Sequence, residues 1–109
     1  ITGPGSPSVL SNMIVAIEQH VDFISDLLIF MRQNGKRNFE ATRQAEIDWV
    51  QQVNGIAEQT LYTSGCNSGY LGANIPGKPK IFMPYIGYPS YVEKCNEIAA
   101  DNYHGLEFS

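Results

Sequence analysis

The 109-residue sequence predicts an α-rich α+β fold with three helices joined by loops and short strands. Three stretches repeat apolar residues at the three- and four-residue spacing that places them on one face of a helix. The stretches between them are rich in glycine, proline, asparagine and serine, which are typical of turns and loops. Three helices with so little sheet do not form a familiar closed unit, so we expect the chain to be part of something larger.

The composition excludes several classes of partner. Hydrophobic residues make up 43% of the sequence and charged residues 17%, as in folded globular proteins. The net charge of −4 disfavours nucleic acid, because binding to phosphates needs basic surface. The most apolar run, "ISDLLIFM", is far shorter than the roughly 20 residues that span a bilayer, so we expect no membrane partner.

The two cysteines point to a cytoplasmic protein. Cys66 and Cys95 lie 29 positions apart, without the close spacing of a metal site. We expect two free thiols in a reducing compartment, and a disulfide between them is the alternative. No leader that resembles a signal peptide is recognisable, which agrees with a cytoplasmic location.

The first helix is predicted over residues 11–34, after a turn formed by residues 1–10. Glycine, proline and serine dominate the opening "ITGPGSPS", which favours the turn. Gly35 suits the left-handed conformation that ends many helices. The helix carries one apolar stripe, formed by Leu10, Met13, Ile14, Ile17, Val21, Ile24, Leu27, Leu28 and Met31.

The second helix is predicted over residues 42–60. The preceding "KRNFEAT", residues 36–42, is interpreted as a connector that ends in Thr42, a suitable N-cap. Gly55 weakens the helix by roughly 1 kcal/mol relative to alanine. Its predicted inner face consists of Ile47, Trp49, Val50, Val53, Ile56 and Ala57.

A long loop over residues 62–79 precedes the third helix, predicted over residues 89–104. The intervening "KIFMPYIG" suggests a short strand that Pro84 restricts to a sheet edge or a bulge. Pro89 suits the first turn of a helix, and Gly105 ends it. The final "LEFS" is a candidate short strand. The face of the third helix is traced by Tyr91, Val92, Cys95, Ile98, Ala99 and Asn102.

The turn before the first helix is a candidate ligand site. Gly3 and Gly5 allow a close backbone approach, and a helix N-terminus favours an electron-rich ligand atom. The dinucleotide-binding pattern GxGxxG fails here, because Ser8 replaces the third glycine. From the residues alone, a purely structural turn and a ligand-facing turn both remain open.

The other polar candidates favour structural interpretations. Glu97, Asp101 and His104 share one face and could bind a metal, but a solvated helix end is the expectation. His20 is expected to be packed or on the surface, and Trp49 to lie in the core. Ser8 and Ser11 lack evident histidine and aspartate partners, so we expect no hydrolase triad. The sequence thus offers no catalytic residue and no metal site.

Three motifs resemble one enzyme family. "GPGSPSVLSNM" (3–13), "NSGYLGANIPGKPKIFMPYIG" (67–87) and "KCNEIAADNYHGLEF" (94–108) resemble the C-terminal part of the Baeyer–Villiger monooxygenases. These are class B flavoproteins of the phenylacetone and cycloalkanone monooxygenase type. The intervening helical segments match in order and spacing, so the resemblance covers nearly the whole chain. It implies that residues 1–109 form the last portion of a Rossmann-like FAD-binding domain.

The resemblance implies an oxidoreductase that uses FAD, NADPH and O2. Such an enzyme inserts one oxygen atom next to a ketone carbonyl and forms an ester or lactone, with the cofactor supplying the chemistry. The family's catalytic arginine and both dinucleotide-binding turns lie upstream, so this chain alone is expected to be inactive and colourless. Two alternatives remain, a class B flavoprotein that oxygenates sulfur or nitrogen, and an independent helical module that binds a protein.

The resemblance also implies the roles of individual residues. Asn12 and Met13 would lie beside FAD at the start of the first helix. Residues 62–79 would form the family's control loop, which orders over bound NADP. In that loop, Gly69 stands where the family usually has tryptophan. The substrate pocket would include Pro7, Ser8, Val9 and Leu10. The NADP-contacting residues would include Ser68, Gly69, Tyr70 and Asn74.

Overall fold

The computed structural model describes residues 2–8, 11–64, 69–72, 75–78 and 82–109. It confirms the predicted class, because three helices dominate the chain and a single small sheet accompanies them in the described part. The elements are α1 (Met13–Gln33), β1 (Phe39–Ala41), α2 (Arg43–Glu58), the 3-10 helices η1 (Leu61–Thr63) and η2 (Gly69–Leu71), α3 (Tyr88–Ala100) and β2 (Leu106–Phe108).

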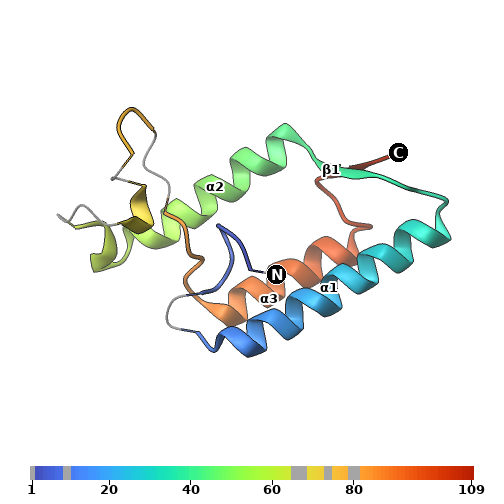
Figure 1. Cartoon of the computed structure of the whole chain (residues 1–109), viewed down its shortest axis with the longest axis horizontal. Coiled ribbons are helices and arrows are strands. Elements are labelled where there is room, and N and C mark those ends of the chain that lie inside the picture. The colour runs from blue at the N-terminus through green and yellow to red at the C-terminus, as the bar shows by residue number, and fades with distance from the viewer. Residues whose placement is uncertain (1, 9–10, 65–68, 73–74, 79–81) are drawn as a thin grey trace.

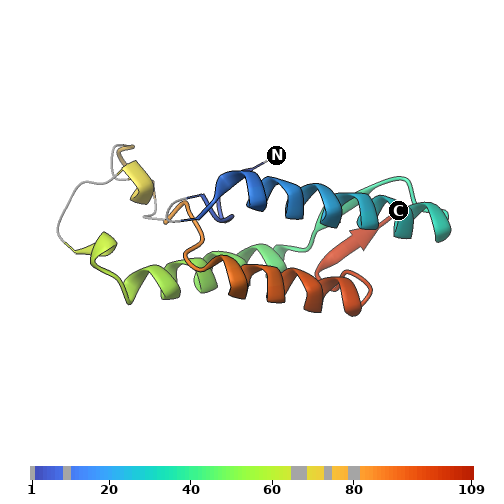
Figure 2. The same cartoon turned by 90° about the horizontal axis from the view of Figure 1, so that it is seen from below.

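The molecule is elongated, with principal extents of 49 × 30 × 20 Å. Helices α1 and α3 lie side by side along its length (Figure 1), and they are in direct contact. The sheet of β1 and β2 lies at one end (Figures 1 and 2). The short helices η1 and η2 lie at the other end, next to the last turn of α2. The N-terminal turn (residues 1–10, described over 2–8) lies between α2 and α1.

Helix α1 is shorter than the predicted 11–34 because its caps lie inside that range. The Oδ1 atom of Asn12 accepts hydrogen bonds from the N–H groups of Ile14 (3.0 Å) and Val15 (3.4 Å), which makes Asn12 the N-cap. Asn34 is the C-cap, and Gly35 has the predicted left-handed conformation, with φ of 66°.

Helix α2 begins as predicted, because the Thr42 hydroxyl accepts a hydrogen bond of 3.1 Å from the Ala45 N–H. Val53 and Ala57 are buried, in agreement with the predicted inner face. Ile47 was expected on this face, but its side chain is 38% exposed.

The connector predicted over residues 36–42 contains a strand. Residues of β1 pair antiparallel with β2, with Phe39 opposite Phe108 and Ala41 opposite Leu106. The prediction failed because three residues are too few for an alternating pattern and the partner lies far away in the sequence. The final strand predicted at the C-terminus is confirmed as β2.

The segment after the long loop is not a strand in its described part. Residues 82–87 adopt no regular structure, and residues 80 and 81 of the predicted strand lie outside the described residues. Phe82 and Tyr85 instead insert into a cluster with Val53 and Ala57 of α2. Apolar side chains that anchor an irregular segment to a helix produce the same short apolar run as a buried strand.

Helix α3 ends four residues earlier than predicted. It starts at Tyr88 after Gly87, and Pro89 occupies the first turn as expected. Asn102 and Tyr103 have φ values of 53° and 58°, which a right-handed helix cannot include, so Asn102 lies off the helical face. The Tyr103 ring packs with Leu27 and Met31 of α1 in a second core cluster.

Candidate functional site

The N-terminal turn is held by its own polar groups. The Ser6 hydroxyl donates to the Gly3 carbonyl over 2.5 Å, and the Ser6 N–H donates to the same oxygen over 3.3 Å. Ser6 and Pro7 are buried, whereas Ser8 is half-buried. The described part of the turn, residues 2–8, is therefore a defined structure.

Trp49 of α2 closes one side of this turn. Its indole Nε1–H donates to the Gly5 carbonyl over 3.1 Å. Gly5 has φ of 78°, and a Cβ atom on it would lie 2.6 Å from the indole Nε1. A side chain at position 5 would therefore suffer both an unfavourable backbone conformation and a steric clash.

Residues 82–86, the return segment, close the other side of the turn. The Gly5 N–H donates to the Met83 carbonyl over 2.5 Å, and the Tyr85 N–H donates to the Ser6 carbonyl over 3.0 Å. The Tyr85 ring stacks on Trp49, with centroids 5.5 Å apart and planes at 22°. Trp49 was predicted only as a core residue, and the contacts of Met83 and Tyr85 with the turn were not predicted at all.

The N-terminus of α1 presents apolar surface around the positive end of the helix dipole. Met13, Ile14 and Val15 are exposed, and the first turn contains no acidic residue. An aromatic ligand whose edge carries negative charge fits these features, because the side chains offer an apolar surface and the dipole attracts the charge. The residues present thus fit a flavin ring edge. The Asn12 oxygen is already engaged by the helix, so ligand contacts are left to its amide nitrogen and to backbone.

The structure places some of the predicted site residues and leaves others outside its description. Pro7 and Ser8 belong to the described part of the N-terminal turn, Asn12 is the N-cap of α1, and Met13 is its first residue. Val9, Leu10, Ser68 and Asn74 lie outside the described residues. Gly69 and Tyr70 belong to η2, and the Tyr70 carbonyl accepts a hydrogen bond of 2.7 Å from the Met83 N–H.

The remaining titratable groups among the described residues show no catalytic arrangement. The described part of the chain contains no group of three potential metal ligands. Glu97 pairs with Lys94 at 3.2 Å on the surface, and His104 is exposed, as a solvated helix end requires. No helix in the described ranges is long and apolar enough to cross a membrane.

A buried cluster lies between α1 and α3. His20 is buried, and the Tyr91 ring meets it edge-on with centroids 5.4 Å apart. Cys95 is a free, buried thiol, as expected. Burial raises the pKa of Cys95, although hydrogen bonds with Tyr91 and Gln19 oppose the shift. Burial, followed by the neighbouring Cys95, raises the pKa of Tyr91. Both groups therefore stay protonated near neutral pH, which makes the Cys95 thiol a poor nucleophile.

Comparison with known proteins supports the predicted resemblance. No family model matches the chain. The acetone monooxygenase (methyl acetate-forming) of Gordonia sp. is 35% identical over 97% of this chain and 20% of its own length. A Baeyer–Villiger monooxygenase of Pseudooceanicola batsensis is 33% identical, over 97% of this chain and 19% of its own. The structure of an oxidized steroid monooxygenase bound to NADP superposes with a TM-score of 0.86 at 38% identity, over 99% of this chain and 19% of that one.

Two further relatives bear on cofactor and reaction. An FAD-binding monooxygenase of Aspergillus aculeatus is 26% identical over 96% of this chain and 18% of its length. A phenazine N-monooxygenase of Lysobacter antibioticus is 31% identical over 94% and 19%.

The chain is therefore homologous to one segment of flavoprotein monooxygenases. In particular, it is homologous to a segment of the Baeyer–Villiger monooxygenases, and the resemblance predicted from the three motifs is confirmed. The chain spans about a fifth of the length of these relatives.

Proposed function

We propose that this chain is a segment of a longer NADPH-dependent flavin monooxygenase. The whole enzyme would insert one oxygen atom of O2 next to a ketone carbonyl and release an ester or lactone. The observation that carries this proposal is the similarity to Baeyer–Villiger monooxygenases over 97% of the chain. We place the enzyme in the cytoplasm, with the remainder of its own FAD- and NADP-binding polypeptide as the partner of this segment.

Two parts of this segment would contact ligands. Residues at the start of α1, Asn12 and Met13, would face the flavin, where the helix dipole favours the negative charge of the reduced ring. The substrate pocket would include Pro7, Ser8, Val9 and Leu10. Reduced FAD would supply the oxygen-transfer chemistry when bound.

The loop over residues 62–79 would cover the nicotinamide cofactor through Ser68, Gly69, Tyr70 and Asn74. In the described part of the loop, the hydrogen bond between Tyr70 and Met83 connects η2 to residues 82–86. A cover of this kind excludes water from the reacting groups. The described residues offer no nucleophile or acid–base pair, so the catalytic groups are expected elsewhere in the polypeptide.

The test is expression of the full-length polypeptide and of residues 1–109 alone. The full-length protein is expected to be yellow and to convert simple and cyclic ketones to esters or lactones with NADPH. The isolated segment is expected to be colourless and inactive. A full-length protein that binds FAD but forms no oxygenated product from a broad ketone panel would contradict the proposal.

A second candidate is oxygenation of nitrogen or sulfur. The observation that favours it is the 31% identity to a phenazine N-monooxygenase over 94% of the chain. A matched panel of ketones, sulfides and aromatic N-heterocycles separates the two. Products only from the sulfides or heterocycles would replace the ketone assignment.

A further inference from the structure

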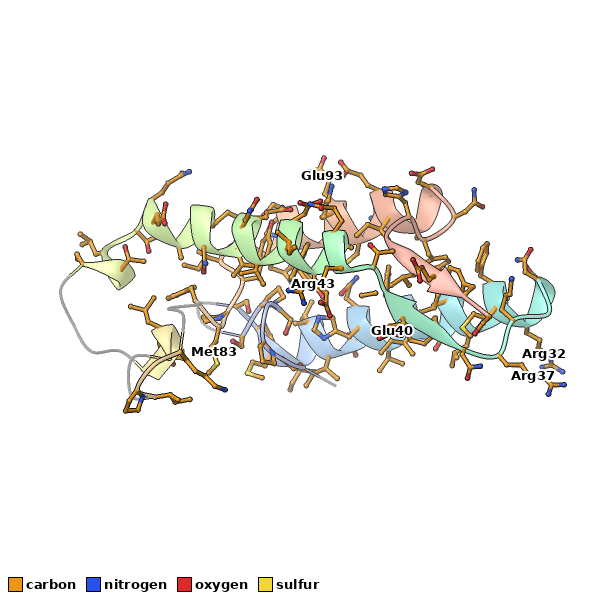
Figure 3. The ribbon with its side chains drawn as sticks, turned by 90° about the horizontal axis from the view of Figure 1, so that it is seen from above. Arg32, Arg37, Glu40, Arg43, Met83 and Glu93 are labelled. Atoms are coloured by element: carbon orange, nitrogen blue, oxygen red, sulfur yellow. The ribbon has the colours of Figure 1, made fainter. Side chains whose placement is uncertain are left out.

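Strand β1 has one free edge. In the described part of the chain the sheet consists of β1 and β2, so β1 is paired on one side only. Every residue from 32 to 41 is exposed, and Phe39 keeps 49% of its surface accessible. Figure 3 shows Glu40 on this strand and Arg37 pointing outward at the end of the molecule. The free edge is therefore accessible to another strand.

The hydrogen bonds on the β2 side show which backbone groups of β1 face outward. Asn38 and Thr42 flank β1, and the N–H of each donates a hydrogen bond of 2.8 Å to a residue that flanks β2. Inward and outward positions alternate along an antiparallel pair, so the N–H and C=O groups of Phe39 and Ala41 point away from β2. The trans peptide that turns the Asn38 N–H toward β2 also turns the Arg37 carbonyl outward.

The β1 strand of a second copy of the chain fits this edge. When the two strands run antiparallel with Phe39 opposite Phe39 of the second copy, the outward N–H and C=O groups of both residues pair. The same register brings the Ala41 N–H to the outward Arg37 carbonyl of the second copy. It also places the two half-exposed Phe39 rings opposite each other, and aromatic pairs stabilise neighbouring strands.

The charges along the edge favour this occupant. Lys36 and Glu40 carry opposite charges, and Glu40 belongs to no ion pair among the described residues while it lies opposite Glu107 of β2. In the paired strands Glu40 lies diagonally across from Lys36 of the second copy, and the two-fold axis repeats the contact. The neighbouring register would set Glu40 directly opposite Glu40 of the second copy, which their like charge disfavours. Edge charges of a single sign would instead repel a second copy.

We propose that β1 is an interaction edge through which the full-length protein associates with a second copy of itself. The two β1 strands pair antiparallel about Phe39. The strand is short, so the association is a concentration-dependent equilibrium between monomer and dimer. The proposal is independent of the reaction that the enzyme catalyses, because it uses only residues 36–41.

The test measures the molar mass of the full-length protein by light scattering over a roughly 100-fold range of concentration. The mass is expected to rise from that of a monomer toward that of a dimer. Lys36→Glu and Glu40→Lys are each expected to raise the dissociation constant at least about 5-fold, because two symmetric attractive contacts become repulsive. Glu40→Lys also removes the like-charge pair with Glu107, so misfolding does not explain its effect. A protein that stays monomeric at every concentration would overturn the proposal.

Exchange of the two charges separates direct contact from a general effect of charge. The double variant Lys36→Glu with Glu40→Lys restores opposite charges across the axis and is expected to dimerise like the unchanged protein. A mixture of the two single variants is expected to form a heterodimer for the same reason. A double variant as weak as the single ones, or a mixture without heterodimer, would overturn the proposal.

A second pair of variants tests the backbone pairing. Ala41→Pro removes an outward N–H and leaves the hydrogen bonds to β2 in place, whereas the control Ala41→Val keeps the N–H. The proline variant is expected to be monomeric and the valine variant to dimerise. A dimer that survives Ala41→Pro would overturn the proposal. So would a monomeric unchanged protein whose melting temperature Ala41→Pro lowers, because a further part of its own polypeptide would then occupy the edge.

Discussion

At the residue scale, Gly5 is the described glycine at which an added Cβ atom would make the closest contact. Its left-handed backbone and the indole 2.6 Å from a Cβ position both require glycine. Replacement of Gly5 by alanine is expected to lower the free energy of unfolding of the full-length protein by about 1–3 kcal/mol. Denaturant unfolding measures this change.

Gly3 provides the control for that prediction, two residues earlier in the same turn. A Cβ atom there would meet nothing within 4 Å, and its φ lies outside the left-handed region. Gly3→Ala is therefore expected to be close to neutral. Equal destabilisation by both substitutions would contradict the geometry described for Trp49 and Gly5.

Gly69 is the second glycine with a specific expectation. The resemblance places a tryptophan here, and a Cβ atom at Gly69 would meet nothing within 4 Å. In the full-length enzyme, Gly69→Trp is expected to lower peroxide release, because a large aromatic side chain adds contact area to the closed loop. Peroxide formed per NADPH consumed measures the effect, with Gly69→Ala as the control for lost backbone freedom. Unchanged or increased peroxide release would contradict this role of the loop.

Cys95 is expected to be the less reactive kind of thiol. Burial raises its pKa, so the native protein holds it protonated and shielded at pH 8. In a Cys66→Ser variant, native Cys95 is expected to react at least about 10-fold more slowly with a disulfide reagent than in the denatured chain. Because the folded-state pKa is the higher one, stability should fall as pH rises above the ordinary thiol value of about 8.5. Equal rates in the native and denatured protein would contradict the buried position.

At the scale of the elements, the positions of the helices could be predicted from the sequence, whereas the structure of the connecting segments could not. Thr42 and Gly35 marked helix ends correctly, because caps depend on neighbouring residues only. Strand β1 was missed because its partner is almost 70 residues away, at β2. The end of α3 was missed because Tyr103 turns into the core in a left-handed conformation that tertiary packing imposes.

In the candidate site too, local features were predictable from the sequence and long-range contacts were not. The candidate site residues before α1 were predicted from a local pattern and a resemblance, and their ligand contacts stay a prediction; Asn12 is the N-cap of α1. The contacts of Trp49, Met83 and Tyr85 with the turn were not predictable, because they join residues 44 to 79 positions apart. Nothing in the local pattern around Trp49 distinguishes a core residue from one that also holds a turn.

Helix α1 carries an exposed apolar stripe that tests the segment interpretation. Ile14, Val21 and Leu28 lie seven residues apart on one face and are 71%, 42% and 54% exposed. Residues 1–109 expressed alone are therefore expected to self-associate. The double change Val21→Lys and Leu28→Lys is expected to shift them toward monomer in size-exclusion chromatography with light scattering.

The control adds the same charge elsewhere. Gln33→Lys and Gln51→Lys are at exposed positions outside the stripe and should leave self-association unchanged. A monomeric, cooperatively unfolding wild-type segment would favour an independent protein-binding module over a part of a larger enzyme.

At the scale of the whole molecule, the elongated shape and the separate core clusters indicate a segment that packs against further parts of a polypeptide. One cluster joins α2 to the return segment, and the other joins α1 to the residues after α3. Helix α1 presents apolar side chains outward, as expected of a segment that packs against further parts of a polypeptide. This organisation and the similarity to a fifth of the monooxygenase relatives agree with each other.

The central claim is that the full-length protein inserts oxygen from O2 into a ketone. Turnover of a ketone with NADPH under ¹⁸O₂, followed by mass spectrometry of the product, tests it directly. The ester or lactone is predicted to carry one ¹⁸O atom and to form only when NADPH is present. A product without the label, or NADPH oxidation that yields only hydrogen peroxide with every ketone, would contradict the claim.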